Sequence, residues 1–533
     1  MNLTRSQFDA IVVGAGIAGL YMLHRLREAG LSSLVLERGH GVGGTWYWNR
    51  YPGARCDVES LEYSYSFCEE LQQEWNWSER YSGQPEILDY INHVAQSFDL
   101  LKDVKFGTSV LQATFDDTTS QWIVETDQGD RFTALFLIMA TGCLSSTNTP
   151  EIEGRDSFKG NTYHTGNWPH HEVDFGGQRV GIVGTGSSAI QAIPHIASGC
   201  ESLTVFQRTP NFSVPARNGS ISKSYESRVK ANYSEFRARN RLMPAALGST
   251  FIGNNQSALD ASAEEQQLEF AKRWKIGGFG FLGAFNDLTI NKESNDVAAE
   301  FARERIRETV EDPATAEVLC PDSVIGCKRL CLDTNYFETY NLPHVDLIDI
   351  RRNPVERVTR TGIQCQDSKY ELDSIIFATG FDAMTGTLLR INITGSSGLT
   401  LQEAWKAGPQ TFLGLAVNGF PNMFLISGPG SPSVLTNMIV SIEQHVEWIE
   451  KCIGYVLENQ HSAIQADEEA QDDWVQHVNL LASRTLYPSC NSWYLGANIP
   501  GKPRVFMPHV GFPNYVAKCE EVRSLDYEGF TFS

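Results

Sequence analysis

The spacing of apolar residues near the start of the chain is typical first of a strand, then of a helix and then of a second strand. A β-branched run at residues 11–13 leads into a glycine-rich turn, and an amphipathic segment then carries Leu20, Leu23 and Leu26 on one face. A second apolar run at residues 33–36 follows. This pattern predicts a βαβ unit with parallel strands.

The turn of this unit has the composition of a dinucleotide site. Its spacing Gly14-x-Gly16-x-x-Gly19 permits a tight turn and lets a pyrophosphate approach the backbone at a helix N-terminus. Glu37 ends the second predicted strand, where a carboxylate can hold a ribose 2′-hydroxyl. The glycine motif alone is weak, but strand, helix, strand and acid in this order indicate a site for FAD.

The same pattern recurs over residues 179–209. The turn is Gly184-x-Gly186-x-x-Ala189, and the following apolar run ends in Arg208, with no acid at that position. A carboxylate would repel a 2′-phosphate, whereas a guanidinium can bind it with two hydrogen bonds. The second site is therefore predicted to bind NADPH and not NADH.

Two apolar runs that end in Ala-Thr-Gly, at residues 136–142 and 375–380, indicate where the chain crosses between the two units. We predict an α/β fold with two Rossmann-like dinucleotide-binding domains, for FAD and NADPH, and a helical insertion. The predicted domains are 1–143 (first part of the FAD domain), 144–380 (NADPH domain, with the insertion at about 219–325) and 381–533 (second part of the FAD domain).

The composition narrows the class of protein. With 41% apolar and 20% charged residues it is typical of a soluble globular chain. The net charge of −21 argues against nucleic acid as the main partner, because phosphate binding needs a basic surface. The apolar run at residues 10–23 is too short to span a membrane, and no basic cluster precedes it. We therefore expect a cytoplasmic protein without a membrane partner.

The chain has eleven cysteines and no CxxC pair. Cys327 and Cys331 are separated by three residues, which fits neither a redox pair nor a zinc site. Reduced thiols and no metal are therefore expected.

Two aromatic segments are candidates for function. Residues 158–170, FKGNTYHTGNWPH, are too polar and too rich in Gly and Asn for a strand, so a connecting loop is predicted. Residues 43–57, GGTWYWNRYPGARCD, follow the predicted FAD ribose contact. In an extended segment Arg55 and Asp57 face the same way and form a candidate acid–base pair beside the flavin. A packed aromatic loop without function is the alternative.

These two segments and the paired nucleotide motifs carry a resemblance to a known family. Over essentially its whole length the chain resembles the class B flavoprotein monooxygenases, and within them the type I Baeyer–Villiger monooxygenases, most of all the phenylacetone branch. The motif F-x-G-x-x-x-H-x-x-x-W-P is matched by Phe158, Gly160, His164, Trp168 and Pro169. A second motif is matched by Gly43, Gly44, Trp46, Tyr51, Pro52, Gly53 and Asp57.

The resemblance implies an NADPH- and FAD-dependent oxidoreductase that inserts one oxygen atom of O2 next to a ketone carbonyl. The product is an ester or lactone, the oxidant is a flavin C4a-peroxide, and sulfoxidation is an expected side activity. The partners implied are a ketone and O2. The sequence does not indicate an oligomeric state.

The resemblance also assigns site residues. Arg329 falls on the catalytic arginine, and Asp57 orients it. Lys328, with Arg208 and Thr209, would hold the 2′-phosphate of NADPH. Trp493 falls on a loop that closes over the nicotinamide cofactor. Position 143, next to the flavin, is Cys where the phenylacetone branch has Gln.

The full predicted FAD site comprises Gly14, Gly16, Gly19, Glu37, Gly44, Thr45, Trp46, Trp48, Asp57, Tyr63, Val110 and Met438. The full predicted NADPH site comprises Arg55, Thr185, Gly186, Ser187, Ser188, Gln191, Arg208, Thr209, Lys328, Arg329 and Trp493. His164 is expected to be a hinge residue between the two domains rather than a proton donor.

Three other functions share the two-nucleotide layout. An N- or S-oxygenating flavin monooxygenase is the nearest alternative, because it would use the same cofactors on electron-rich substrates. An NADPH–disulfide oxidoreductase needs a CxxC facing the flavin, which the sequence lacks. A silent FAD-binding scaffold would not need Arg329 and Asp57 together.

Overall fold

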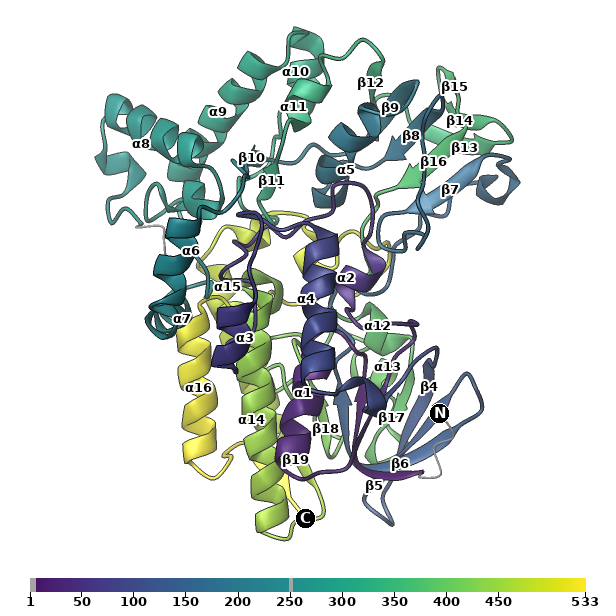
Figure 1. Cartoon of the computed structure of the whole chain (residues 1–533), viewed down its shortest axis with the longest axis vertical. Helices are drawn as coiled ribbons and strands as arrows, with labels where there is room; N and C mark the ends of the chain where they lie inside the picture. Colours follow the sequence, from purple (N-terminus) through teal and green to yellow (C-terminus); the bar gives the residue numbers. More distant parts are fainter. Residues whose placement is uncertain (1–5, 249–252) are drawn as a thin grey trace.

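The computed structural model describes residues 6–248 and 253–533, and its two large sheets lie toward opposite ends of the long axis (Figure 1). The first sheet has the strand order β17-β4-β5-β6-β1-β2-β3, with β18 paired to β6. Its strands are β1 (Gln7–Val13), β2 (Ser33–Leu36), β3 (Val104–Lys105), β4 (Val110–Asp116), β5 (Gln121–Thr126), β6 (Arg131–Met139), β17 (Asn392–Thr394) and β18 (Met423–Leu425). The sheet therefore combines strands from residues 7–139 with strands from residues 392–425, which agrees with the expectation of a first domain split along the chain.

The helix after the first glycine turn is α1 (Ile17–Glu28). Leu20, Leu23 and Leu26 are fully buried, which confirms the predicted apolar face. The long helix α14 (Met438–Glu458) packs against α1, and α16 (Phe512–Ser524) packs against α14. A C-terminal layer thus covers the helix on which the first glycine motif depends.

The second sheet is wholly parallel, with the order β12-β9-β8-β16-β7. Its strands are β7 (Asn161–His164), β8 (Arg179–Val183), β9 (Ser202–Gln207), β12 (Val345–Asp349) and β16 (Ser374–Phe377). Helix α5 (Ser187–Ala197) follows β8, as the repeated motif predicts. Both predicted strand–helix–strand units are therefore present.

The prediction that residues 158–170 form only a connecting loop is wrong, because Asn161–His164 is strand β7. It pairs in parallel with β16, with His164 opposite Phe377. It is an edge strand whose Asn161 and Thr162 are exposed, so it lacks the apolar run that marks a central strand.

The remaining segments surround the two sheets. Helices α6 (Lys223–Lys230), α7 (Tyr233–Leu242), α8 (Ala263–Ile276), α9 (Lys292–Thr309) and α10 (Pro313–Leu319) occupy the predicted insertion. The other elements are α2 (Thr45–Trp48), α3 (Glu69–Glu74), α4 (Gln84–Ser97), β10 (Ser213–Pro215), β11 (Cys331–Asp333), α11 (Tyr336–Thr339), β13 (Val355–Thr359), β14 (Gly362–Cys365), β15 (Lys369–Glu371), α12 (Gly386–Leu389), α13 (Leu401–Ala404), β19 (Ile464–Ala466), α15 (Glu468–Ser483) and β20 (Phe530–Phe532).

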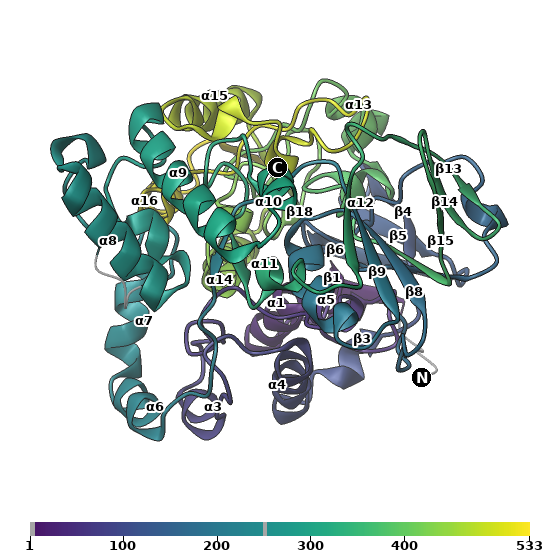
Figure 2. The same cartoon turned by 90° about the horizontal axis from the view of Figure 1, so that it is seen from above.

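The insertion helices α6–α8 and the strands β13–β15 lie on opposite sides of the molecule in both views (Figures 1 and 2). The insertion has its own buried aromatic cluster, in which Phe270, Phe281 and Phe301 contact one another. The exact domain boundaries stay a prediction. Within the described ranges, no helix combines the length and apolar character that crossing a bilayer would require.

The two glycine turns share one packing constraint. Gly14 has φ +106°, and a Cβ there would lie 2.7 Å from the carbonyl oxygen of Ala140. Gly184 has φ +109°, and a Cβ there would lie 2.6 Å from the carbonyl oxygen of Ala378. Ala140 and Ala378 each begin one of the Ala-Thr-Gly segments. Each turn therefore packs its first glycine against the crossing segment of its own unit.

A Gly184→Ala substitution should destabilise the fold by about 1–3 kcal/mol, because the new methyl group meets backbone at a positive φ. Gly186→Ala is the matched control, since Gly186 has φ −81° and a Cβ there meets no described atom within 4 Å. Thermal unfolding of both variants checks this. Equal unfolding midpoints for the two variants would contradict the packing constraint.

Candidate active site

A cavity of about 510 Å³ lies between the two nucleotide units and collects most of the predicted site residues. From the predicted FAD set it is lined by Gly14, Gly16, Glu37, Gly44, Thr45, Trp46, Trp48, Asp57, Tyr63, Val110 and Met438. From the predicted NADPH set it is lined by Arg55, Ser187, Ser188, Gln191, Arg329 and Trp493. Cys143 also lines it. One cavity therefore serves both motifs.

The FAD side of the cavity is built from backbone. Helix α1 begins after Gly16 without a side-chain cap, so its first N–H groups are open to a ligand. Gly44 approaches Gly16 so closely that a Cβ on it would lie 2.9 Å from the Gly16 Cα. Gly19 packs behind the turn, where a Cβ would lie 1.8 Å from the Gly14 carbonyl oxygen. These features fit a dinucleotide pyrophosphate.

Glu37 is fixed at the edge of this site. Its carboxylate accepts hydrogen bonds from the backbone N–H groups of Ala15 (2.7 Å) and Gly39 (2.6 Å). The side chain is buried and lines the cavity. A carboxylate has about four acceptor positions, so two backbone bonds leave capacity for a ribose hydroxyl.

Asp57 and Arg329 form a bidentate ion pair across the cavity wall. Arg329 Nε and Nη2 each donate to a different Asp57 carboxylate oxygen at 2.8 Å. Arg329 Nη1 donates to the Val434 carbonyl oxygen at 2.8 Å. The guanidinium also lies 4.7 Å from the centre of the Phe279 ring. Three groups from separate segments thus fix one cation.

The environment of Arg329 keeps its guanidinium protonated. Burial by itself would lower the pKa of the guanidinium, but the Asp57 carboxylate reverses this and holds the pKa above its ordinary value. The side chains of Arg329 and Asp57 are 21% and 27% exposed, and both line the cavity. Arg329 therefore presents a permanent positive charge to whatever occupies it.

The predicted pairing of Arg55 with Asp57 is wrong, although both residues line the cavity. Arg55 Nη1 instead donates to Glu79 and to the Tyr81 carbonyl oxygen, both at 3.0 Å. Arg329 contacts both oxygens of Asp57, whereas Arg55 takes its partners from residues 79–81. Sequence spacing could not identify the partners of either side chain.

Five residues of the predicted NADPH set lie outside the lining of the cavity: Thr185, Gly186, Arg208, Thr209 and Lys328. Thr185 Oγ1 donates to the Thr209 carbonyl oxygen at 2.9 Å, which joins the glycine turn to the end of β9. Burial and the neighbouring Arg208 guanidinium lower the pKa of Lys328. Neither cation forms an ion pair within the described ranges. Two adjacent cations without a carboxylate partner fit a phosphate.

His164 joins the two crossing segments. Its Nδ1 accepts a hydrogen bond from the Gly166 N–H at 3.0 Å. Its Nε2 lies 3.4 Å from both the Asn148 carbonyl oxygen and Thr379 Oγ1, which belong to the segments after β6 and β16. Burial lowers the pKa of His164, so the ring is neutral near pH 7. This position suits the predicted hinge role, which stays a prediction.

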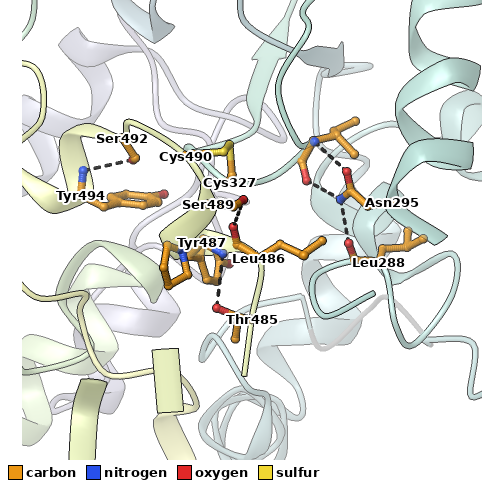
Figure 3. The surroundings of a disulfide bond; sticks show 12 residues. Leu288, Asn295, Cys327, Thr485, Leu486, Tyr487, Ser489, Cys490, Ser492 and Tyr494 are labelled. Carbon is orange, nitrogen blue, oxygen red and sulfur yellow. Dashed lines mark hydrogen bonds between the residues drawn. A yellow bond between two sulfur atoms is a disulfide. The ribbon is translucent and has the colours of Figure 1, made fainter. Parts of the chain in front are cut away.

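The prediction that all cysteines are reduced is wrong, because Cys327 and Cys490 form a disulfide (Figure 3). The two residues are 163 positions apart, so no local spacing could reveal the bond. Sequence reasoning also missed Val434 and Phe279, which contact Arg329 through a backbone carbonyl and a ring face. Neither contact leaves a motif.

Comparison with known proteins identifies the family. A family model described as pyridine nucleotide-disulphide oxidoreductase matches residues 11–277. A phenazine N-monooxygenase of Lysobacter antibioticus is 41% identical over 99% of this chain and 97% of its own length. A Baeyer–Villiger monooxygenase of Pseudooceanicola batsensis is 41% identical over 99% of this chain and 96% of its own length. The chain belongs to the flavin-dependent Baeyer–Villiger monooxygenases.

A solved structure supports this assignment. An oxidised steroid monooxygenase bound to NADP is 48% identical, covers 99% of each chain and has a TM-score of 0.94. As a Baeyer–Villiger monooxygenase, the chain is an oxidoreductase that uses FAD, NADPH and O2. The finer resemblance to the phenylacetone branch stays a prediction.

The disulfide does not make this Baeyer–Villiger monooxygenase a disulfide oxidoreductase. Neither Cys327 nor Cys490 is among the described residues that line the cavity. A disulfide that exchanges electrons with a flavin has to face it. The family model for pyridine nucleotide-disulphide oxidoreductases therefore reflects the shared nucleotide units.

Replacing Arg208 with Ala should raise the KM for NADPH about tenfold or more, because a phosphate loses charge-assisted hydrogen bonds. The KM for NADH should change less than about twofold, since NADH has no 2′-phosphate. Steady-state kinetics with both nucleotides measure this. Arg352→Ala, at a residue whose side chain is 83% exposed, is the matched control. Equal effects on both nucleotides would remove the phosphate assignment.

Proposed function

We propose that this Baeyer–Villiger monooxygenase converts a ketone into an ester or lactone at the Arg329 side of the cavity. The observation that carries the proposal is the fixed cation there. Arg329 is held by Asp57 and the Val434 carbonyl in a cavity lined by residues of both nucleotide units. NADPH is the electron donor, and O2 is the source of the inserted oxygen atom.

The chemistry divides between the cofactor and the chain. When bound, FAD reduced by NADPH supplies the activated oxygen. Arg329 supplies a preorganised positive charge for the negative charge that develops on the ketone oxygen. Arginine suits this position because it keeps its proton when desolvated, whereas a lysine can lose it. Asp57 compensates the partly buried charge and fixes its direction.

Exclusion of water is the second task that we assign to the chain. Met438, at the first turn of α14, and Trp493, in the turn 493–495, line the cavity. Tyr494 and Leu495, next to Trp493, are buried against Val434 and Cys143. Closure by apolar side chains lowers the local dielectric and strengthens the interaction of Arg329 with substrate charge.

The substrate we propose is an aryl-alkyl or cyclic ketone. Support comes from the apolar side chains that line the cavity together with Arg329, which include Leu144, Val434 and Met438. We also infer a cytoplasmic location, because nine of the eleven cysteines are free and only Cys327 and Cys490 form a disulfide among the described residues. The acidic net charge supports the absence of a nucleic-acid partner.

Heteroatom oxygenation is the second candidate, because one relative is named as a phenazine N-monooxygenase. An aromatic nitrogen attacks the activated oxygen directly and develops no negative charge on a carbonyl oxygen. Arg329 would then contribute far less to the oxygenation step. The same variant therefore separates the two functions.

An Arg329→Ala variant should lose ester formation by about 100-fold or more, the usual effect of removing one preorganised stabiliser. NADPH oxidation should continue, with O2 reduced to hydrogen peroxide. The measurement is NADPH consumption over a panel of cyclic, aryl and linear ketones, with products identified by mass. Arg329→Lys is the control, because it keeps a cation but cannot reach both Asp57 oxygens and Val434. Ester formation at the wild-type rate in Arg329→Ala would refute the proposal, and N-oxide formed from phenazine instead of ester would establish the second candidate.

A further inference from the structure

The Cys327–Cys490 disulfide joins the two segments that carry Arg329 and Trp493 (Figure 3). Cys327 lies two residues before Arg329, and Cys490 lies three residues before Trp493. Residues in a chain advance at most about 3.6 Å each, so both cavity-lining side chains start within roughly 11 Å of the bond along their own segments. One covalent link therefore controls how these two segments sit relative to each other.

The Cys327 side of the link is firmly anchored. Ile325 donates its N–H to the Asn295 side chain at 3.0 Å, and Asn295 Nδ2 donates to the Ile325 carbonyl at 2.9 Å. Asn295 Nδ2 also donates to the Leu288 carbonyl oxygen at 2.7 Å (Figure 3). Asn295 is fully buried in α9. The segment that leads to Arg329 is thus fixed to the insertion.

The turn that carries Cys490 forms its hydrogen bonds mainly with residues close to it in the sequence. The hydrogen bonds that described residues 487–495 make stay within residues 485–505, such as Tyr494 N–H to Ser492 Oγ at 3.1 Å. Leu486, just before this stretch, donates its N–H to the Thr289 carbonyl at 2.8 Å. Apart from side-chain packing, the disulfide is the attachment of this turn to the Arg329 segment.

The bond lies just below the surface. Cys327 is 2% exposed and Cys490 is 8% exposed, while the neighbours Ser489 and Asn491 are exposed. A small opening of the turn would therefore admit a dithiol. Disulfides in reducing compartments are usually transient and redox-responsive, which fits a bond in this position.

We propose that the Cys327–Cys490 disulfide is a redox-controlled clamp that holds the Trp493 turn over the nicotinamide nucleotide. Cys490 is a positioning residue, because it acts through Trp493. A dithiol supplies two electrons and two protons: the S–S bond breaks, both sulfurs become thiols, and the dithiol closes to a cyclic disulfide. The proposal rests on the proposed function, in which Trp493 helps to close the cavity that holds the nucleotide.

Released from the clamp, the turn retains the nucleotide less well. We expect the Kd for NADP+ to rise about five- to tenfold after reduction, with more NADPH oxidised to hydrogen peroxide per product formed. The maximal rate of NADPH oxidation at saturating NADPH should stay within about twofold. A staple that served stability alone would shift the unfolding midpoint without changing nucleotide affinity.

The experiment uses the purified FAD-loaded protein, oxidised or reduced with dithiothreitol, and measures NADP+ binding by calorimetry. Mass analysis of alkylated peptides reports the state of Cys327 and Cys490. The Cys490→Ser variant should have the same Kd for NADP+ as the reduced protein, and dithiothreitol should not change that Kd. Cys68→Ser is the matched control, since Cys68 is a free N-cap and a serine can keep its bond to Leu71. This control should keep the full redox response.

Two results would overturn the clamp: an unchanged Kd after both thiols are shown to be free, or free thiols at both positions in the oxidised protein. Cys327→Ser provides a second variant in case Cys490→Ser does not fold. The test of the clamp and the test of the ketone reaction can give different results. A redox-dependent Kd with no ester from any ketone would sustain the clamp and refute the ketone reaction, and the reverse pair of results would do the opposite.

Discussion

The bidentate ion pair between Arg329 and Asp57 is the constraint on which the site depends. Asp57 follows α2 of the first unit, and Arg329 lies between the insertion and β11. Removing one partner of this partly buried pair is unfavourable, because the other charge is left without compensation. The pair therefore ties the two nucleotide units to a common geometry and fixes the direction of the one charge that we propose stabilises the reacting ketone.

The rest of the architecture supports that arrangement. Each glycine turn packs against its own Ala-Thr-Gly segment, and the ends of both crossing segments meet at His164. In open parallel sheets ligands bind at the carboxyl ends of the strands, next to the helix N-termini. Two such ends face one cavity here. Arg329 lines the same cavity, where we propose that the electron donor and the oxygen-activating cofactor meet.

Sequence patterns predicted those parts of the fold that are apolar and local. Strands β1, β2, β8 and β9 and helices α1 and α5 follow directly from their periods and glycines. Strand β7 was missed because an edge strand exposes polar residues. The partners of Arg55 and the Cys327–Cys490 bond depend on segments far apart in the chain, which spacing cannot report. Arg329 was located by resemblance alone, because a single arginine in a loop has no periodic signal.

The most direct test of the central claim is a double-mutant cycle on the ion pair. The ester-forming kcat/KM is measured for the wild type, Asp57→Ala, Arg329→Ala and the double variant. If Asp57 acts by holding Arg329, the double variant should be no slower than Arg329→Ala, since removing the holder of an absent group costs nothing further. A loss in the double variant equal to the product of the two single losses would contradict the account.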